Sequence, residues 1–197
     1  MKFFIPIIIL SIFMLGCSKD DESSTANSEI EGTWKTPCHL TSGGSYYHTL
    51  TVSVSGTKIV EEVNYFSDSG CRSDNYTTKE SYSSYSAGQD MVFSSYGSSG
   101  GSGKQYTMTF NSVTETPQNS AEVNWYNNNS YCGDSDWALD TEKDTTGKTC
   151  GGSARASANT TIYGLYLLDG NKLFTRISSS SYPNSVYTGD NDTLTKQ

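Results

Sequence analysis

Apolar side chains recur at every second position along much of this chain, and no segment beyond the first sixteen residues keeps the period of a helix. Leu50, Val52 and Val54, for example, alternate with threonine and serine. Such alternation places apolar side chains on one face of a β-strand and polar ones on the other. Clusters of Gly, Ser and Asn separate the alternating segments, as turns do. The pattern predicts an all-β, antiparallel meander.

About eight or nine strands are expected at the spacing of hairpins, and a meander of this length closes into a barrel or folds into a sandwich. The segment Ser94–Lys104, rich in Gly and Ser, is interpreted as a mobile loop. The expected strands are Gly32–Lys35, Tyr46–Val54, Thr57–Phe66, Tyr76–Tyr85, a stretch around Met91–Tyr96, Lys104–Val113, Ala121–Tyr126, Thr161–Leu168 and Lys172–Ile177.

Composition limits the size of the core. Only 34% of the residues are apolar, the first sixteen residues hold a disproportionate part of them, and the 14 tyrosines are only half apolar. A large helical or α/β enzyme core is hard to build from this chain, whereas a small Tyr-rich β domain with disulfides is feasible. The net charge of −8 and the lack of Lys or Arg runs argue against a nucleic-acid partner.

The first sixteen residues read as a secretory leader, with Lys2 followed by an apolar run and a small residue. The run spans roughly 20 Å as a helix, which is too short for the ~30 Å core of a bilayer. It ends in Met14-Leu15-Gly16-Cys17, which resembles the lipobox of bacterial lipoproteins. That resemblance implies cleavage before Cys17 and its acylation with palmitate-like chains. The alternative is a plain signal peptide followed by an incidental cysteine.

Residues 17–29 are expected to form a flexible tether, because they are polar and lack aromatic side chains. The sequence Ser18-Lys19-Asp20-Asp21-Glu22 resembles the surface-export signal of some bacterial lipoproteins. The expected location is therefore the outer membrane, with the acylated Cys17 as lipid anchor and the domain on the cell surface as a further hypothesis.

The first hairpin can be aligned residue by residue if Ser55 and Gly56 form its two-residue turn. This register places Val52 opposite Ile59, Leu50 opposite Glu61, His48 opposite Val63, and Tyr46 opposite Tyr65.

The same register predicts the disulfides. Spacing alone allows three pairings of the four cysteines that remain after Cys17. Extending the register brings Cys38 close to the position opposite Cys71, which leaves Cys132 to pair with Cys150. An oxidising compartment would permit both bonds. A zinc site at Cys38, His39 and His48 is disfavoured because the paired short spacings of such sites are missing, so no metal is expected.

Catalysis is not expected. Only His39 and His48 could act as an imidazole base, and no phosphate loop, dinucleotide fingerprint or nucleophile elbow occurs. The acidic residues between 134 and 144 are interleaved with lysine and are interpreted as a solvated segment. We therefore expect no catalytic residues and no cofactor.

His48 and Glu61 fall on the otherwise apolar, inward face of the first hairpin, diagonal to each other. They either satisfy each other inside the fold or anchor the polar end of a ligand in an apolar cavity. A register error that places them outside is the third possibility.

Gly32-Thr33-Trp34 at the start of an all-β domain resembles the Gly-x-Trp signature of lipocalins. In that family a late-strand arginine packs across the tryptophan at the barrel floor, which implies a pair between Trp34 and Arg176. Asn64–Cys71, with Cys38 behind the tryptophan, is similar to the lipocalin-like modules of the adenomatosis polyposis coli down-regulated Wnt antagonists. Small bacterial lipoproteins share a late segment like Asp136–Cys150.

These observations predict a monomeric, lipocalin-like barrel of about eight strands over residues 30–197. The resemblance implies, as the expected function, non-catalytic binding of a small apolar or amphipathic ligand inside the barrel. The alternative is a surface interaction or adhesion module with a filled barrel, whose contacts include Tyr82 and Tyr85. The candidate ligand-binding residues are His48, Glu61, Tyr65, Tyr106, Phe110 and Trp125.

Overall fold

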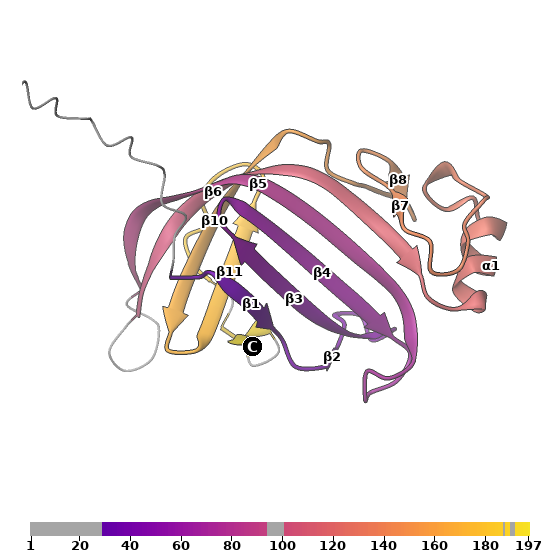
Figure 1. Cartoon of the computed structure of the whole chain (residues 1–197), viewed down its shortest axis with the longest axis horizontal. Helices are drawn as coiled ribbons and strands as arrows, with labels where there is room; N and C mark the ends of the chain where they lie inside the picture. Colours follow the sequence, from indigo (N-terminus) through magenta and orange to yellow (C-terminus); the bar gives the residue numbers. More distant parts are fainter. Residues whose placement is uncertain (1–28, 94–100, 187, 190–191) are drawn as a thin grey trace, which may run out of the picture.

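The computed structural model describes residues 29–93, 101–186, 188–189 and 192–197. The leader, Cys17 and nearly all of the tether lie outside these residues. Figure 1 shows a strongly curved sheet with one short helix, α1, at one end. The elements are β1 (Gly32–Lys35), β2 (His39–Leu40), β3 (Tyr47–Ser55), β4 (Lys58–Phe66), β5 (Asp74–Phe93), β6 (Gly101–Pro117), α1 (Ser120–Asn128), the 3₁₀ turn η1 (Tyr131–Gly133), β7 (Lys143–Asp144), β8 (Thr149–Cys150), β9 (Ser153–Ala154), β10 (Thr160–Asp169), β11 (Lys172–Ser178) and β12 (Leu194–Lys196).

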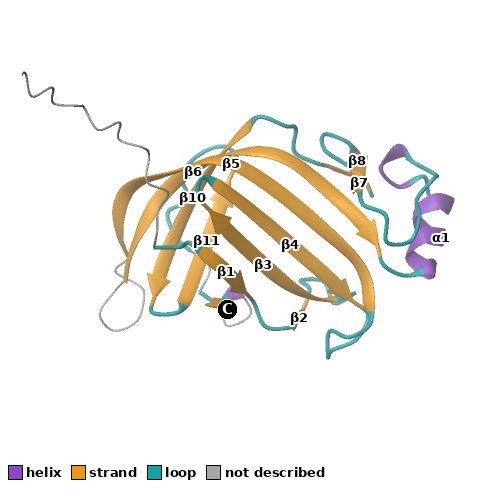
Figure 2. Cartoon of the chain, viewed as in Figure 1, coloured by secondary structure: helices purple, strands orange, loops and turns teal. Residues whose placement is uncertain are grey.

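Eight antiparallel strands close into a barrel, which confirms the predicted fold class. The order around the barrel is β3, β4, β5, β6, β10, β11, β12 and β1, and β1 closes the ring by pairing with β3. Almost every strand therefore pairs with its neighbour in sequence (Figure 2). Among the described residues, no helix is long and apolar enough to cross a membrane.

The strands β5 and β6 are longer than the alternation predicts. The two separate strands expected around Tyr76–Tyr85 and Met91 are one continuous strand, β5, with register shifts along its pairing with β6. The register shifts change the face of the sheet on which successive side chains lie, so the alternation of apolar and polar residues is interrupted between the two expected strands. The expected loop at 94–104 is corrected at its end, because residues from Gly101 onward belong to β6; residues 94–100 lie outside the described part.

The predicted strand Ala121–Tyr126 is wrong, because these residues form α1. Val123 and Trp125 imitate a period of two, but the local capping signal is helical. The side chain of Asn119 accepts a hydrogen bond from the backbone N–H of Glu122 at 2.8 Å, which is the usual N-cap interaction. Asn119 with an acidic residue three positions later is a signature that could have identified the helix.

The hairpin register is also wrong, by one residue in the position of the turn. Ser55 pairs with Lys58, so Gly56 and the next residue form the turn, and every cross-strand partner moves by two positions. A shift of two preserves which face each side chain occupies. His48 now lies opposite Tyr65, and Val52 lies opposite Glu61.

Both predicted disulfides are present, Cys38–Cys71 and Cys132–Cys150. The argument that led to the first bond does not hold, however. Cys38 does not lie on an extension of β3; it immediately precedes the separate strand β2, whose His39 pairs with His48.

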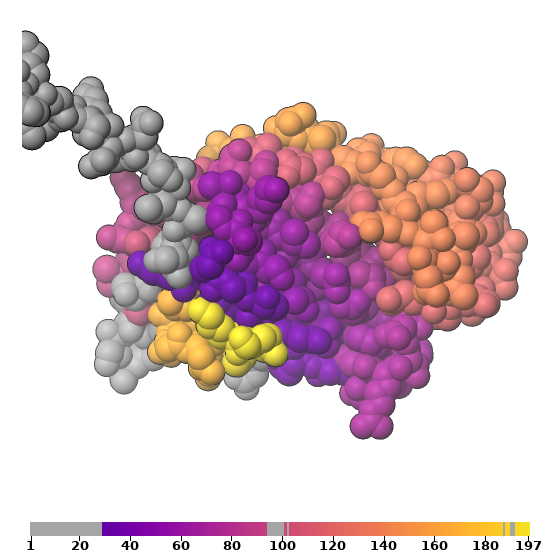
Figure 3. Space-filling model, viewed as in Figure 1, coloured from indigo at the N-terminus to yellow at the C-terminus, as the bar shows by residue number. Residues whose placement is uncertain are grey.

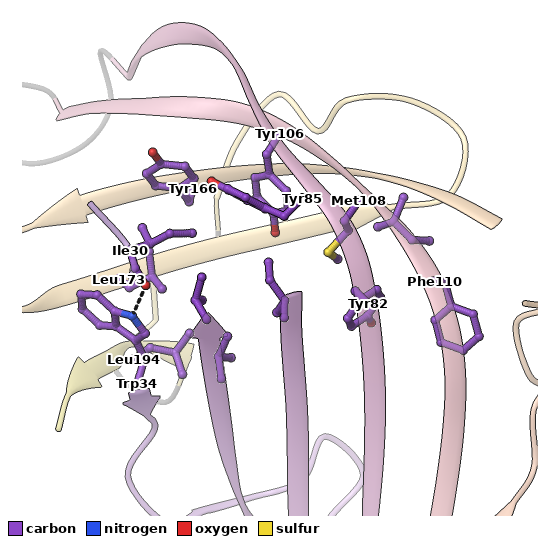
Figure 4. Packing of buried hydrophobic residues seen from close by; sticks show 14 of the residues in the cluster. Ile30, Trp34, Tyr82, Tyr85, Tyr106, Met108, Phe110, Tyr166, Leu173 and Leu194 are labelled. Atoms are coloured by element: carbon purple, nitrogen blue, oxygen red, sulfur yellow. Dashed lines mark hydrogen bonds between the residues drawn. The ribbon is translucent and has the colours of Figure 1, made fainter. Parts of the chain in front are cut away.

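Trp34 belongs to the barrel's filled region and is 1% exposed; Figure 4 shows it at one end of the buried cluster, beside Ile30 and Leu194. Its Nε1 donates a hydrogen bond to the carbonyl of Ile30 at 2.9 Å. The cation over its ring is Lys196, whose Nζ lies 5.2 Å from the ring centroid, rather than the expected Arg176. The reason is β12, which the sequence did not reveal: it inserts between β11 and β1, so that Lys196 becomes the partner of Trp34. In Figure 3 the yellow C-terminal residues lie beside the indigo β1.

The interior around Trp34 is packed with aromatic side chains. Gly164 makes room for one of them, because a Cβ at this position would lie 2.0 Å from Cζ of Tyr106. The buried cluster consists of Ile30, Trp34, Val52, Val54, Ile59, Tyr82, Tyr85, Tyr106, Met108, Phe110, Val113, Ile162, Tyr166, Leu173 and Leu194. From β10, Ile162 and Tyr166 join this cluster. Leu165 and Leu167 are buried instead in a second cluster with Phe93 and Phe174.

A third, smaller core lies beside α1 and contains Tyr126, Trp137 and the Cys132–Cys150 disulfide. It surrounds Glu115, a fully buried carboxylate from β6. Glu115 accepts hydrogen bonds from Tyr126 and Tyr131 and forms a 2.7 Å ion pair with Arg155. A buried charge with this many partners is satisfied, so the network is interpreted as structural.

Candidate functional site

A cavity of about 240 Å³ lies where the barrel wall is incomplete. β12 pairs with β11 only at Lys172 and Leu173, so the later residues of β11 have no β12 partner on that side. The cavity lies between this unpaired part of β11 and the strands β3 and β4. Its lining residues are Thr36, His39, His48, Leu50, Glu61, Thr175, Arg176, Ile177 and Asp192.

Glu61 supplies a carboxyl group to this cavity from β4. It lies in a row of paired residues that runs from Val52 on β3 through Glu61 to Glu80 on β5. Removal from water, and then the charge of Glu80, raise the pKa of Glu61 to about 7. In the described part of the chain, no hydrogen bond or ion pair joins Glu61 to another side chain. Near neutral pH the cavity thus contains a carboxyl group that is balanced between its two protonation states.

His48 supplies an imidazole from β3. Its Nδ1 is buried and has no hydrogen-bond partner among the described residues. Its ring lies 4.0 Å from the ring of His39, centroid to centroid. Burial lowers the pKa of His48, the charge of His39 lowers it further, and Asp192 raises it in part. The neutral imidazole is therefore favoured, with an unsatisfied nitrogen that a bound molecule or water could fill.

His48 and Glu61 line the same cavity, but they do not form the predicted diagonal pair. The one-residue displacement of the turn moves Glu61 from the position opposite Leu50 to the position opposite Val52. The two side chains therefore lie four residues apart along the hairpin, about 13 Å at the usual rise of a strand. The inward face was predicted correctly, whereas their mutual hydrogen bond was not.

The other candidate ligand-binding residues are dispersed. Tyr65 stacks on Tyr76 with a centroid distance of 4.3 Å, and its ring lies 5.8 Å from that of His48. Tyr106 and Phe110 belong to the filled core. Trp125 lies on α1, outside the barrel, and its side chain is 48% exposed.

Sequence reasoning missed the far side of the cavity, formed by Thr175, Arg176, Ile177 and Asp192. Arg176 had been assigned to Trp34; its Nη1 instead donates to Ser185 Oγ at 2.9 Å. Only the position of β12 shows that Lys196, and not Arg176, lies over Trp34. A strand of three residues is too short for its alternation to be detected in the sequence. Asp192 precedes that strand and carried no signal of its own.

The described residues contain no group of three or more His, Cys, Asp or Glu side chains that could hold a metal ion. The acidic segment expected to be solvated is tied by surface ion pairs, including Lys148 Nζ to Asp134 at 2.7 Å and Lys79 Nζ to Glu142 at 2.7 Å. Such pairs contribute little to stability and need no ligand.

No protein-family model matches this chain, and no curated protein shows a significant match to it. The barrel, its disulfides and the cavity geometry therefore carry the functional argument.

Proposed function

We propose that this protein is a membrane-anchored lipoprotein that binds a small amphipathic ligand in the cavity beside β12, without catalysis. The cavity offers apolar contacts from Leu50 and Ile177 and polar contacts from His48 and Glu61. Ligand sites are typically apolar concavities with a few polar groups that fix orientation.

The unpartnered Nδ1 of His48 is the observation that carries the proposal. A buried polar atom without a partner costs on the order of 1–3 kcal/mol, and a ligand polar group would recover that cost. Glu61, close to half-protonated at neutral pH, offers a second position that accepts or donates a hydrogen bond.

The size of the cavity narrows the ligand class. Its volume of about 240 Å³ is below the ~300 Å³ at the lower end of typical drug-sized sites. The core around Trp34 fills the adjoining part of the barrel. We therefore propose a compact amphipathic molecule, smaller than a full acyl chain.

The ligand test is native mass spectrometry of the purified protein, followed by titration of any co-purified molecule into Leu50→Trp. This substitution places a larger ring in the cavity wall, so ligand mass and affinity should both be lost. Leu139→Ala is the matched control, because Leu139 is an exposed apolar residue that does not line the cavity. Equal ligand binding by wild type and Leu50→Trp would refute the cavity as the site.

The anchor rests on the position of Cys17 at the end of the apolar leader. Cys17→Ser should release the protein from membranes into the soluble fraction, because the acyl chains attach through that sulfur. Unchanged membrane retention would refute lipidation and leave the plain signal peptide as the explanation.

The alternative, a surface interaction module, is favoured by the filled part of the barrel. Two of its expected contact residues are excluded, however, because Tyr82 and Tyr85 are buried in the core. This alternative predicts that the protein purifies without any ligand and that Leu50→Trp has no functional effect.

A further inference from the structure

A second concave site lies outside the barrel, between α1 and the adjoining ends of the sheet. It is a groove of about 360 Å³, and aromatic rings form most of its wall. None of its residues lines the barrel cavity described above. The groove is lined by Tyr46, Tyr76, Ala121, Glu122, Trp125, Tyr126 and Tyr131, and is hereafter called the aromatic groove.

Ring stacking and hydrogen bonds to buried groups fix the orientation of the rings that line the aromatic groove. Tyr126 and Tyr131 stack with a centroid distance of 4.3 Å, and their hydroxyl groups both donate to the buried carboxylate of Glu115. Tyr76 packs edge-on against Tyr46 at 5.9 Å. The disulfide at Cys132 fixes the backbone next to Tyr131. The site is therefore preorganised, which reduces the entropic cost of binding.

Trp125 is the exposed part of this wall. Its ring lies 5.7 Å from Tyr126 and 5.6 Å from Tyr131, yet 48% of the residue remains accessible. Tyr126 is itself only 2% exposed and supports the wall from within. The partly exposed Trp125 thus offers a large aromatic face in a groove that four tyrosines also line.

Glu122 supplies the only carboxylate of the groove, and no lysine or arginine is among the described residues that line it. Burial raises the pKa of Glu122, and the charge of Glu115 raises it further. Tyr46 and Glu122 line the same groove. Burial raises the pKa of the Tyr46 hydroxyl, and the charge of Glu122 raises it further. The negative charge of this groove is thus not neutralised by a cationic side chain in its own wall.

We propose that the aromatic groove binds an organic ammonium group, with the cation against the rings of Trp125 and its tyrosine neighbours and its charge balanced by Glu122. Aromatic faces attract cations through their quadrupole, and the attraction is strongest where the cation loses its water. A methylated ammonium is the best match, because it sheds water easily and its methyl groups contact the rings.

The same chemistry can come from a free small molecule or from a lipid headgroup, and choline represents both. The first experiment is calorimetric titration of the purified protein with choline chloride and with 3,3-dimethyl-1-butanol, a neutral molecule of the same shape. We expect choline to bind with a Kd of roughly 0.1–1 mM and the neutral molecule at least ~10-fold more weakly.

Variants then locate the site. Trp125→Ala and Glu122→Gln should each weaken choline binding by roughly 5–10-fold, whereas Trp125→Phe should restore most of it because a π-face remains. Leu139→Ala removes another exposed apolar side chain and should leave binding unchanged. Circular dichroism melting of each variant separates loss of binding from loss of folding.

Co-sedimentation with phosphatidylcholine vesicles, compared with phosphatidylglycerol vesicles, shows whether the bound ammonium group belongs to a lipid headgroup or to a free small molecule. Binding to phosphatidylcholine that free choline displaces supports a headgroup, and binding to choline alone supports a soluble ammonium. The proposal is overturned if choline shows no saturable binding below about 10 mM. It is also overturned if the neutral molecule binds equally well, or if a neutral sugar binds more tightly than choline through Trp125.

Discussion

The two halves of the barrel interior differ although the same strands build both. Around Trp34, inward residues such as Val54, Ile59 and Tyr82 pack into a continuous buried cluster. Further along the same hairpin, the inward positions carry Glu61 and His48, and a cavity replaces the packed core. A chain with few aliphatic residues thus concentrates its apolar volume in one half of the barrel. In the other half, the Nδ1 of His48 and the carboxyl of Glu61 have no hydrogen-bond partner among the described residues.

The difference in packing implies that the filled half mainly stabilises the fold and that the half with the cavity is available for binding. Dense packing in the filled half supplies the free energy of folding, because close-packed aromatic groups bury the most apolar area. Unpaired ionisable groups in the other half cost free energy unless something binds them. Removing an apolar side chain should therefore cost more stability in the filled half than at the cavity wall, and only the neutral replacement of an unpaired ionisable group in the cavity half should stabilise the protein.

The largest effect is expected at Trp34 in the filled half. Trp34→Ala should destabilise the protein by about 3–5 kcal/mol, because it leaves a large void and removes the contact with Lys196. Leu50→Ala, at the cavity wall, should cost only roughly 1 kcal/mol, since its side chain already borders empty space. Urea unfolding monitored by circular dichroism measures both. Equal losses would mean that the two halves are packed alike.

Gly164→Ala tests the filled half without removing any atoms. The new Cβ would collide with the buried ring of Tyr106, so a loss of about 1–3 kcal/mol is expected from overpacking. The same unfolding assay applies. A neutral result would show that the ring of Tyr106 does not occupy the interior as described.

Glu61→Gln should stabilise the protein, and only above mildly acidic pH. Folding raises the pKa of this carboxyl from 4.5 to about 7, so its protonated form favours folding below pH 4.5 and that contribution is lost as the pH rises through 7. At pH 8 the variant should gain about 1–2 kcal/mol, and at pH 4 it should match wild type. Thermal melts at the two pH values test this; a constant difference would contradict it.

His48→Gln should have the smallest effect, with the opposite dependence on pH. The folded state lowers the pKa of this imidazole, so its contribution is present above the ordinary value of 6.5 and is lost as the pH falls through the folded value. The variant should therefore be relatively more stable at pH 5 than at pH 7.5. If the variant instead gains stability at the higher pH, His48 is charged in the folded state.

The fold was largely predictable because alternation survives small errors. A shift of two residues in the hairpin changed every partner of His48 and Glu61 but left both on the inward face. The disulfides were also predicted correctly, although β2 shows that the register argument for Cys38 was wrong.

The site was predicted only in part, because its far wall depends on an element without a local signal. β12 has only three residues, yet its position places Lys196 over the ring of Trp34. Arg176 therefore lines the cavity instead. Trp125 was assigned to the barrel because two apolar residues imitated a strand, whereas the cap at Asn119 starts a helix. Both errors reflect tertiary or capping information that a period of two does not contain.

The pKa of the Glu61 carboxyl, measured by carbon-13 NMR titration of wild type with Glu61→Gln for assignment, tests the divided interior most directly. A value near 7 is predicted, because the group is removed from water and lies near the charge of Glu80, and no ion pair joins it to a cation among the described residues. Saturating ligand that pairs with the carboxylate should shift this value. A pKa near 4.5 would show that the carboxyl is solvated like a surface group and would contradict the polar cavity inside the barrel.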